Sequence, residues 1–212
     1  MVKYIHMVAV LVGISLVSGL SLGWLNSKTF ELAKNNVLRF KKIPAVIKIY
    51  EGFSGPVDDE RKKTMGEELL ASKIELDVGE EGPLLVFVIN KDGKPHTLAI
   101  EREGEGGYGG NVGVMMGFNI QTGNLDGVGI TVHKETPGVG SKVEEHDFRA
   151  QFVGMKKDSN FALKKAGGDV DGISGATRSS TAVADGLKKA QEIYGKHREE
   201  ILSKANEQAG GL

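Results

Sequence analysis

The sequence predicts an α+β protein in which an antiparallel sheet with packed helices follows one N-terminal transmembrane helix. Residues 5–25 carry no charge apart from His6, and this apolar run is long enough to cross a bilayer as a helix. Between residues 84 and 133, short apolar segments alternate with turn residues, a pattern typical of antiparallel strands. After residue 177, apolar residues recur at spacings of three and four, which indicates an amphipathic helix.

The length and composition exclude several classes of function. A chain of 212 residues has room for one membrane anchor and one domain of ordinary size. Its net charge is −1 and it lacks a basic stripe, so we expect no nucleic-acid partner. The chain has no cysteine, which excludes disulfides, thiolate metal sites, iron–sulfur clusters held by this chain and a cysteine nucleophile.

The chain divides into four predicted segments. Trp24 fits an interfacial anchor at the end of the apolar run, and Ile43-Pro44 is expected to interrupt the helical stalk after it. Lys3 before the apolar run is also compatible with a cleaved signal peptide, but the run is longer than a usual signal core, which favours a retained anchor. The segments are a transmembrane anchor (1–27), a helical stalk and lead-in (28–75), the sheet-containing domain (76–195) and a polar, frayed C-terminal tail (196–212).

The sheet is predicted from four apolar segments and the turns between them. The expected strands cover residues 84–89, 96–101, 112–120 and 125–133. Gly104 to Gly109 spell G-x-G-x-x-G, but a dinucleotide-binding site needs a helix next and this loop runs into a strand. A mobile glycine loop is the simplest interpretation.

The histidines do not predict a metal site. His133 has no second ligand at metal spacing, so we interpret it as a hydrogen-bonded histidine at the end of a strand. Phe148 and Phe152 fall with His146 in a short amphipathic helix, and we expect the two aromatic rings in the core.

Asp171 to Thr177, Asp-Gly-Ile-Ser-Gly-Ala-Thr, is the best candidate for chemistry. Thr177 stands at the start of the last amphipathic helix, where free backbone N–H groups and the positive end of the helix dipole stabilise a phosphate. Small Gly175 and Ala176 leave room close to the chain. The alternative is that Thr177 only caps the helix, and Asp171 only forms a turn.

This motif resembles the flavinylation motif of the covalent FMN-binding domain family, found in the G subunit of Rnf-type electron transport complexes and the C subunit of the sodium-translocating NADH:quinone reductase. Other features match in order: the N-terminal apolar helix, Gly107-Tyr108-Gly109-Gly110, Glu135 to Gly140, and the helix after Thr177. The resemblance implies that Thr177 carries FMN through a phosphoester, installed from FAD by a separate flavin transferase.

The resemblance also implies the surroundings of the cofactor. Ser174, Gly175 and Ala176 would adjoin the phosphate, and Glu135, Thr136 and Gly138 would lie near the isoalloxazine or ribityl chain. Tyr108 would fill space or lie near the cofactor. The chain would then be a redox subunit of an ion-translocating oxidoreductase complex, without a complete active site or catalytic residues of its own, and its partners would be other membrane subunits.

The charge distribution and the resemblance disagree on which side of the membrane the large domain lies. Basic residues after the apolar run, among them Lys28, Lys34 and Arg39, outnumber those before it, so the positive-inside rule alone places the large domain in the cytoplasm. The resemblance implies a single-pass protein of the cell membrane with its flavin domain on the extracytoplasmic side. We follow the resemblance, because long domains translocate largely regardless of charge.

The resemblance favours a subunit of an Rnf-type complex, which couples ferredoxin:NAD⁺ electron flow to ion translocation. Two alternatives stay open. One is a subunit of a sodium-translocating NADH:quinone reductase, although the short chain favours the Rnf type. The other is a membrane-tethered binding or assembly module without flavin, in which Thr177 is only a cap and the glycine loops contact partners.

Overall fold

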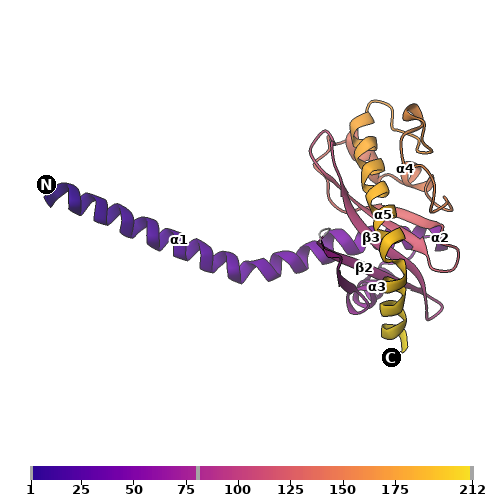
Figure 1. The fold of residues 1–212 in the computed structure, drawn as a ribbon, viewed down its shortest axis with the longest axis horizontal. Helices are drawn as coiled ribbons and strands as arrows, with labels where there is room; N and C mark the ends of the chain where they lie inside the picture. The colour runs from indigo at the N-terminus through magenta and orange to yellow at the C-terminus, as the bar shows by residue number, and fades with distance from the viewer. Residues whose placement is uncertain (1, 80–81, 211–212) are drawn as a thin grey trace. The chain divides into compact units, whose positions relative to one another are not determined.

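The computed structural model describes residues 2–79 and 82–210, which form two compact units, Met1–Phe40 and Lys41–Leu212 (Figure 1). The first unit consists mainly of helix α1, Val2–Val37. By length and composition this helix is apolar enough to cross a membrane, as the sequence predicts, and its apolar side chains are exposed. Residues expected to begin the stalk, 28–37, belong to the same helix.

The second unit is a five-stranded antiparallel sheet with helices, which confirms the predicted fold class. The strands follow one another as a meander, in the order β1-β2-β3-β4-β5. They are β1 (Ile74–Asp77), β2 (Pro83–Lys91), β3 (Lys94–Gly104), β4 (Val112–Asn119) and β5 (Leu125–Ile130). The helical segments are η1 (Leu38–Lys42), α2 (Ile43–Ser54), α3 (Asp59–Ala71), η3 (Gly140–Glu144), α4 (His146–Ala150), η4 (Lys164–Ala166) and α5 (Thr177–Gly210).

Both faces of the sheet are covered, because side chains that alternate along β4 pack against different helices. Phe118 stacks on Tyr194 of α5 at 3.9 Å between ring centroids, and Val114 lies against Gly186 of α5. A side chain added at Gly117 would instead meet Ile49 of α2 at 2.6 Å. Since neighbouring residues of a strand point to opposite faces, α5 and α2 lie on opposite sides of the sheet.

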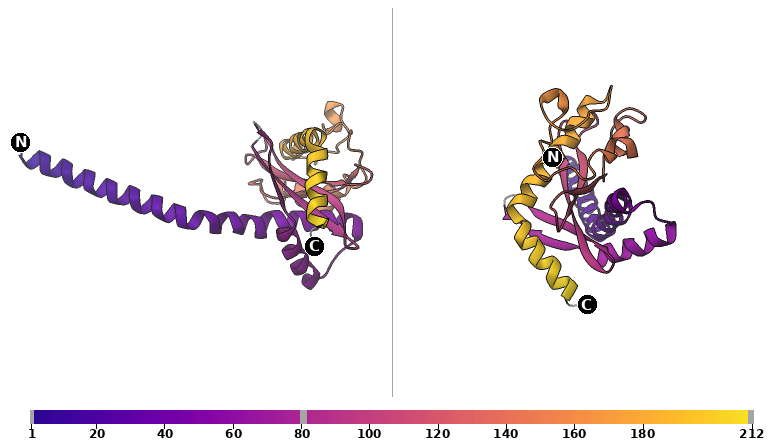
Figure 2. Two further views of the ribbon diagram at one scale, coloured as in Figure 1. Left: turned by 60° about the horizontal axis from the view of Figure 1, so that its bottom comes forward. Right: turned by 90° about the vertical axis from the view of Figure 1, so that its right-hand side faces the viewer.

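Two close backbone approaches fix these helices on the sheet. A Cβ atom at Gly104 would lie 1.7 Å from the carbonyl oxygen of Ala182 in α5, and one at Gly129 would lie 2.3 Å from that of Ala45 in α2. Figure 2 shows α5 running along the sheet to the C-terminal end. Within the segment expected as stalk and lead-in, α2 therefore contributes to the core, with Val46 and Ile49 fully buried.

Two local expectations need correction. Pro44 does not end the helical segment: it lies in the first turn of α2, where its missing N–H is not needed. The polar tail expected over 196–212 is helical as far as Gly210, because Ile201 and Ala205 are buried in the core that α5 shares with the sheet. Residues 211–212 lie outside the described part of the chain.

We expect Gly104→Ala to destabilise the protein by about 1–3 kcal/mol, because the new methyl group would overlap the backbone of α5. Gly66→Ala, within helix α3, is the matched control. Its Cβ would lie 3.6 Å from the Ile43 side chain, an ordinary contact, so we expect the free energy of unfolding to rise by about 0.5–1 kcal/mol. Denaturant unfolding of the full chain in detergent measures both. Equal stability of Gly104→Ala and the wild type would contradict the close approach.

Candidate functional site

Thr177 is the first residue of α5, and its side chain is exposed. The first backbone hydrogen bond of the helix runs from the Ser180 N–H to the Ala176 carbonyl, at 3.0 Å. The N–H groups of residues 177–179 precede this bond and lie at the open end of the helix. The Thr177 hydroxyl therefore stands where a phosphate is stabilised by backbone N–H groups and the helix dipole.

Ser180, rather than Thr177, ties the start of α5 to the preceding loop. The Ser180 hydroxyl accepts a hydrogen bond from the Ile173 N–H at 2.9 Å and donates to the Ala176 carbonyl at 3.0 Å. Within the described residues, the Thr177 hydroxyl forms no hydrogen bond; its backbone carbonyl accepts from Thr181. The interpretation of Thr177 as a cap is therefore wrong for its side chain, which is left free for chemistry.

A cavity of about 360 Å³ opens beside Thr177. It is lined by Tyr108, Glu135, Thr136, Val139, Gly140, Gly175, Ala176, Thr177, Arg178 and Ser179. The glycine loop, the loop after β5 and the start of α5 thus converge, although about 70 residues of sequence separate the first from the last. This volume falls within the range of small-molecule sites, about 300–1,000 Å³.

The predicted site residues are brought together only in part. Glu135, Thr136, Gly175, Ala176 and Thr177 line the cavity, whereas Ser174 and Gly138 are not among its lining residues. Gly175 adopts a positive φ of 79°, which only glycine tolerates easily, immediately before α5. Gly138 has a φ of 72° and donates its N–H to Ser141, so it shapes the turn behind the cavity.

Glu135 holds the three converging segments together. Its carboxylate is buried, with 5% of the residue exposed, and accepts hydrogen bonds from the Gly109 N–H at 2.9 Å and the Tyr108 N–H at 3.3 Å. It also accepts a short hydrogen bond from the Ser179 hydroxyl in α5. The carboxylate is engaged by the protein itself, so its first role is to fix the walls of the cavity.

The hydrogen bonds to Glu135 change its pKa. Burial raises the pKa of this carboxyl group, but hydrogen bonds from Ser179, Gly109 and Tyr108, together with nearby His133, outweigh burial and hold the pKa below 4.5. Glu135 is therefore ionised at neutral pH, and its negative charge lies at the wall of the cavity.

Glycines allow the loops to meet at backbone distance. A Cβ atom at Gly109 would lie 1.9 Å from the Lys134 carbonyl oxygen, and one at Gly140 would lie 2.6 Å from the Ser179 hydroxyl. Arg178 adds a further link: its guanidinium donates to the carbonyls of Gly106 and Gly107, at 3.2 and 3.3 Å. Four further residues line the cavity without having been predicted from the sequence: Arg178, Ser179, Val139 and Gly140. The first two directly follow Thr177, and the last two belong to the predicted loop from Glu135 to Gly140.

The cavity suits a planar aromatic cofactor with a phosphate. Tyr108 is 72% exposed and Val139 is 44% exposed at its rim, which offers an aromatic and an apolar surface to a ring system. The phosphate would lie at the start of α5, beside the Thr177 hydroxyl.

Comparison with known proteins agrees with this geometry. Residues 107–192 match the FMN-binding domain family. The chain is 33% identical over 132 residues to the G subunit of the ion-translocating oxidoreductase complex of Shewanella piezotolerans, covering 59% of this chain and 62% of that protein. It is 32% identical over 140 residues to the protein of the same name from Pseudomonas aeruginosa, covering 63% and 64%. The match thus spans less than two thirds of these relatives.

A solved structure shows the same fold. The C subunit of the Na⁺-translocating NADH-quinone reductase from Parabacteroides distasonis superposes with a TM-score of 0.53 at 22% identity, covering 70% of this chain and 87% of that chain. The expected resemblance to the FMN-binding domain is therefore confirmed, together with the fold class. The covalent linkage and the roles of single residues stay predictions.

His133 and Asp171 have structural partners in the folded domain. His133 accepts the Glu135 N–H at Nδ1, at 3.0 Å, and its Nε2 lies 2.9 Å from Glu144, which confirms a hydrogen-bonded histidine after the last strand. Asp171 forms an ion pair with Lys164 at 2.7 Å. Within the described residues, no group of three or more His, Asp or Glu side chains is arranged to hold a metal ion.

We expect Glu135→Gln to destabilise the sheet-containing domain by about 1–3 kcal/mol at pH 7, because an amide cannot accept all three hydrogen bonds. The folded pKa of Glu135 lies below its unfolded value, so the carboxylate stabilises the fold above about pH 4.5 and this contribution is lost as the pH falls through the folded pKa. Unfolding measured from pH 7 to pH 3 should therefore show a shallower acid dependence in Glu135→Gln. Exposed Glu145→Gln is the control and should follow the wild type.

Proposed function

We propose that this protein is a membrane-anchored electron-transfer subunit that carries FMN covalently through a phosphoester to Thr177, in an Rnf-type complex that couples ferredoxin:NAD⁺ electron flow to ion translocation. One observation carries the proposal: the exposed, unbonded hydroxyl of Thr177 stands at the open end of α5, on the wall of a cavity within a match to the FMN-binding domain. A reactive hydroxyl and a space for a ring system thus lie side by side.

The geometry suits attachment by a flavin transferase. In such a transfer the Thr177 oxygen would attack the phosphorus of the FMN half of FAD, the bond between that phosphorus and the bridging oxygen would break, AMP would leave, and the hydroxyl proton would pass to solvent or to a base of the transferase. Exposure of Thr177 gives a second protein access to it. The N–H groups at the start of α5 stabilise the phosphodiester charge in the product.

The walls of the cavity would orient the attached group. FMN supplies single-electron chemistry when it is bound, and the protein sets its potential through hydrogen bonds and local charge. Glu135 and Arg178 keep the glycine loop against α5, so the cavity is formed before the cofactor arrives. The negative charge of Glu135 behind the wall disfavours added electron density on a nearby ring.

A covalent link fits the proposed place of the protein. A carrier on the extracytoplasmic face of a cell membrane meets little free FMN and would lose a weakly bound cofactor by mass action. The ester removes dissociation altogether. Helix α1 would anchor the domain in the membrane beside other subunits of the complex, which would conduct the ions, since one helix cannot form a pathway alone.

The relatives named as the G subunit of an ion-translocating oxidoreductase complex favour the Rnf type over the sodium-translocating NADH:quinone reductase, whose C subunit shares the fold. The alternative function, a flavin-free binding module, predicts a colourless protein even when it is produced together with a flavin transferase.

We expect Thr177→Ala to abolish covalent flavin and to change the free energy of unfolding by less than about 0.5 kcal/mol, because its hydroxyl makes no hydrogen bond in the folded chain. The protein is produced with a flavin transferase, denatured in SDS and examined for in-gel fluorescence and for a peptide mass increased by FMN minus water. Thr181→Ala, one turn later on α5, is the control and should keep the flavin. Fluorescence that persists in Thr177→Ala would exclude this linkage.

The absence of cysteine allows the sidedness to be measured directly. We expect a single cysteine at the exposed position Lys165→Cys to react with a membrane-impermeant maleimide on intact cells. Lys3→Cys, on the other side of the apolar run, should react only after the cells are permeabilised. The reverse pattern would place the flavin domain in the cytoplasm, as the charge distribution alone suggests.

A further inference from the structure

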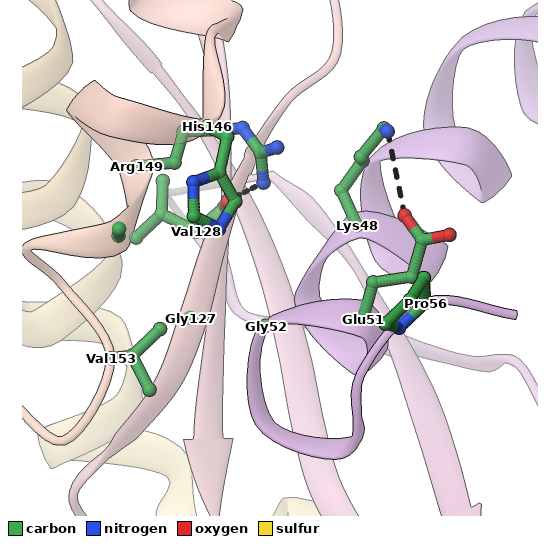
Figure 3. Close-up of a pocket in the computed structure, with 10 residues that line it drawn as sticks. Lys48, Glu51, Gly52, Pro56, Gly127, Val128, His146, Arg149 and Val153 are labelled. Atoms are coloured by element: carbon green, nitrogen blue, oxygen red, sulfur yellow. Dashed lines mark hydrogen bonds and ion pairs between the residues drawn. The ribbon is translucent and has the colours of Figure 1, made fainter.

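A second cavity, of about 540 Å³, lies away from Thr177 and shares no lining residue with the first. Arg149 and His146 of α4 form one wall, and Lys48, Glu51 and Pro56 form the other (Figure 3). The floor is strand β5 at Val128. Helices α2 and α4 thus border a space larger than the cavity beside Thr177.

Arg149 is a buried cation on the wall of this cavity. Only 9% of the residue is exposed, and its guanidinium donates to two backbone carbonyls, those of Glu144 at 2.9 Å and Val128 at 3.3 Å. Within the described residues Arg149 forms no ion pair. Burial lowers the pKa of Arg149, and the more distant charges of Glu51 and Glu144 only partly offset this. A buried charge without a counter-ion is costly, so the site is favourable for an anion.

The remaining charges of the cavity also favour an anion. Lys48 is half exposed and lies 3.4 Å from Glu51, the one acidic residue that lines the cavity. Glu51 is already compensated from a second side, because Lys62 lies 3.2 Å from its other carboxylate oxygen. The positive charges of Lys48 and Arg149 therefore exceed the negative charge that faces them.

The other walls are apolar: Pro56, Val128, Ala150 and Val153 line the same space. Val153 is 40% exposed, so part of its apolar side chain is open to a ligand. A ligand that combines an anionic head with a short hydrocarbon body would satisfy both kinds of surface. We propose that this cavity binds a small organic anion, a carboxylate or phosphate monoester, whose charged group lies between Arg149 and Lys48 and whose carbon skeleton covers Val128 and Val153.

Isothermal titration calorimetry of the full chain in a non-ionic detergent tests the proposal, with phenyl phosphate, hexanoate and inorganic phosphate as probes. We expect phenyl phosphate or hexanoate to bind more tightly than inorganic phosphate, because only the organic probes cover the apolar wall. Affinity should fall as NaCl is raised, since the attraction is electrostatic. The stronger organic probe identifies the head group that the site prefers.

Arg149 donates hydrogen bonds to two backbone carbonyls, so its substitution can unfold the domain. Lys48→Gln is therefore the decisive variant. Its side chain is half exposed, and Lys62 keeps Glu51 paired after the change. We expect Lys48→Gln to weaken binding of the organic probe by about fivefold to tenfold. Lys165→Gln removes the same charge outside the cavity and should change the affinity less than about twofold.

Two outcomes would overturn the proposal: no measurable binding of any probe to the wild type, or equal affinity of the wild type and Lys48→Gln. The second outcome would show that the anion binds at another site, such as the start of α5. Neither outcome bears on the flavin linkage, because loss of flavin is read from Thr177→Ala alone.

Discussion

The buried carboxylate of Glu135 is the interaction on which the candidate site depends. It accepts hydrogen bonds from two N–H groups of the glycine loop and from Ser179 of α5, and so connects segments that are far apart in the sequence. Hydrogen bonds to an ionised acceptor are stronger than hydrogen bonds between neutral groups. Removal of the carboxylate would also leave its buried donors unsatisfied. Residues 105–111 of the glycine loop have no strand or helix of their own, so this carboxylate, Arg178 and the contacts of Glu105 with Asp185 and Lys189 hold the loop in place.

The backbone of Glu135 is connected to the second cavity through a short series of contacts. The Glu135 N–H donates to His133, His133 contacts the Glu144 side chain, and the Glu144 carbonyl accepts from Arg149. Segment η3 carries at one end Gly140, which lines the cavity beside Thr177, and at the other end Glu144, whose carbonyl accepts from Arg149 of the second cavity.

Sequence patterns predicted the elements whose residues are close together in the chain. Strands β2 to β5 were found because each contains an apolar run bounded by turn residues, whereas β1 was missed because Ile74 and Leu76 alone carry its pattern. The helical tail was missed because Ile201 and Ala205 stand four residues apart among charges, and only the sheet beneath shows that they are buried. Thr177 was found from a short motif. The contact of Arg178 with Gly107 joins residues 71 apart, and a single sequence carries no information on such a distance.

The site separates a rigid support from a reactive group. Glu135, Ser179 and Ser180 are buried and hydrogen-bonded, whereas Thr177, on the same helix end, is exposed and its hydroxyl is unengaged. This arrangement follows from the helix period: residues 179 and 180 point toward the sheet and the loops, while residues 177 and 181 point outward. A threonine two or three positions later would be packed inside and out of reach of a modifying enzyme. The position of the helix start, set by the positive φ of Gly175 and by Ser180, therefore decides which hydroxyl is exposed at the open end of α5.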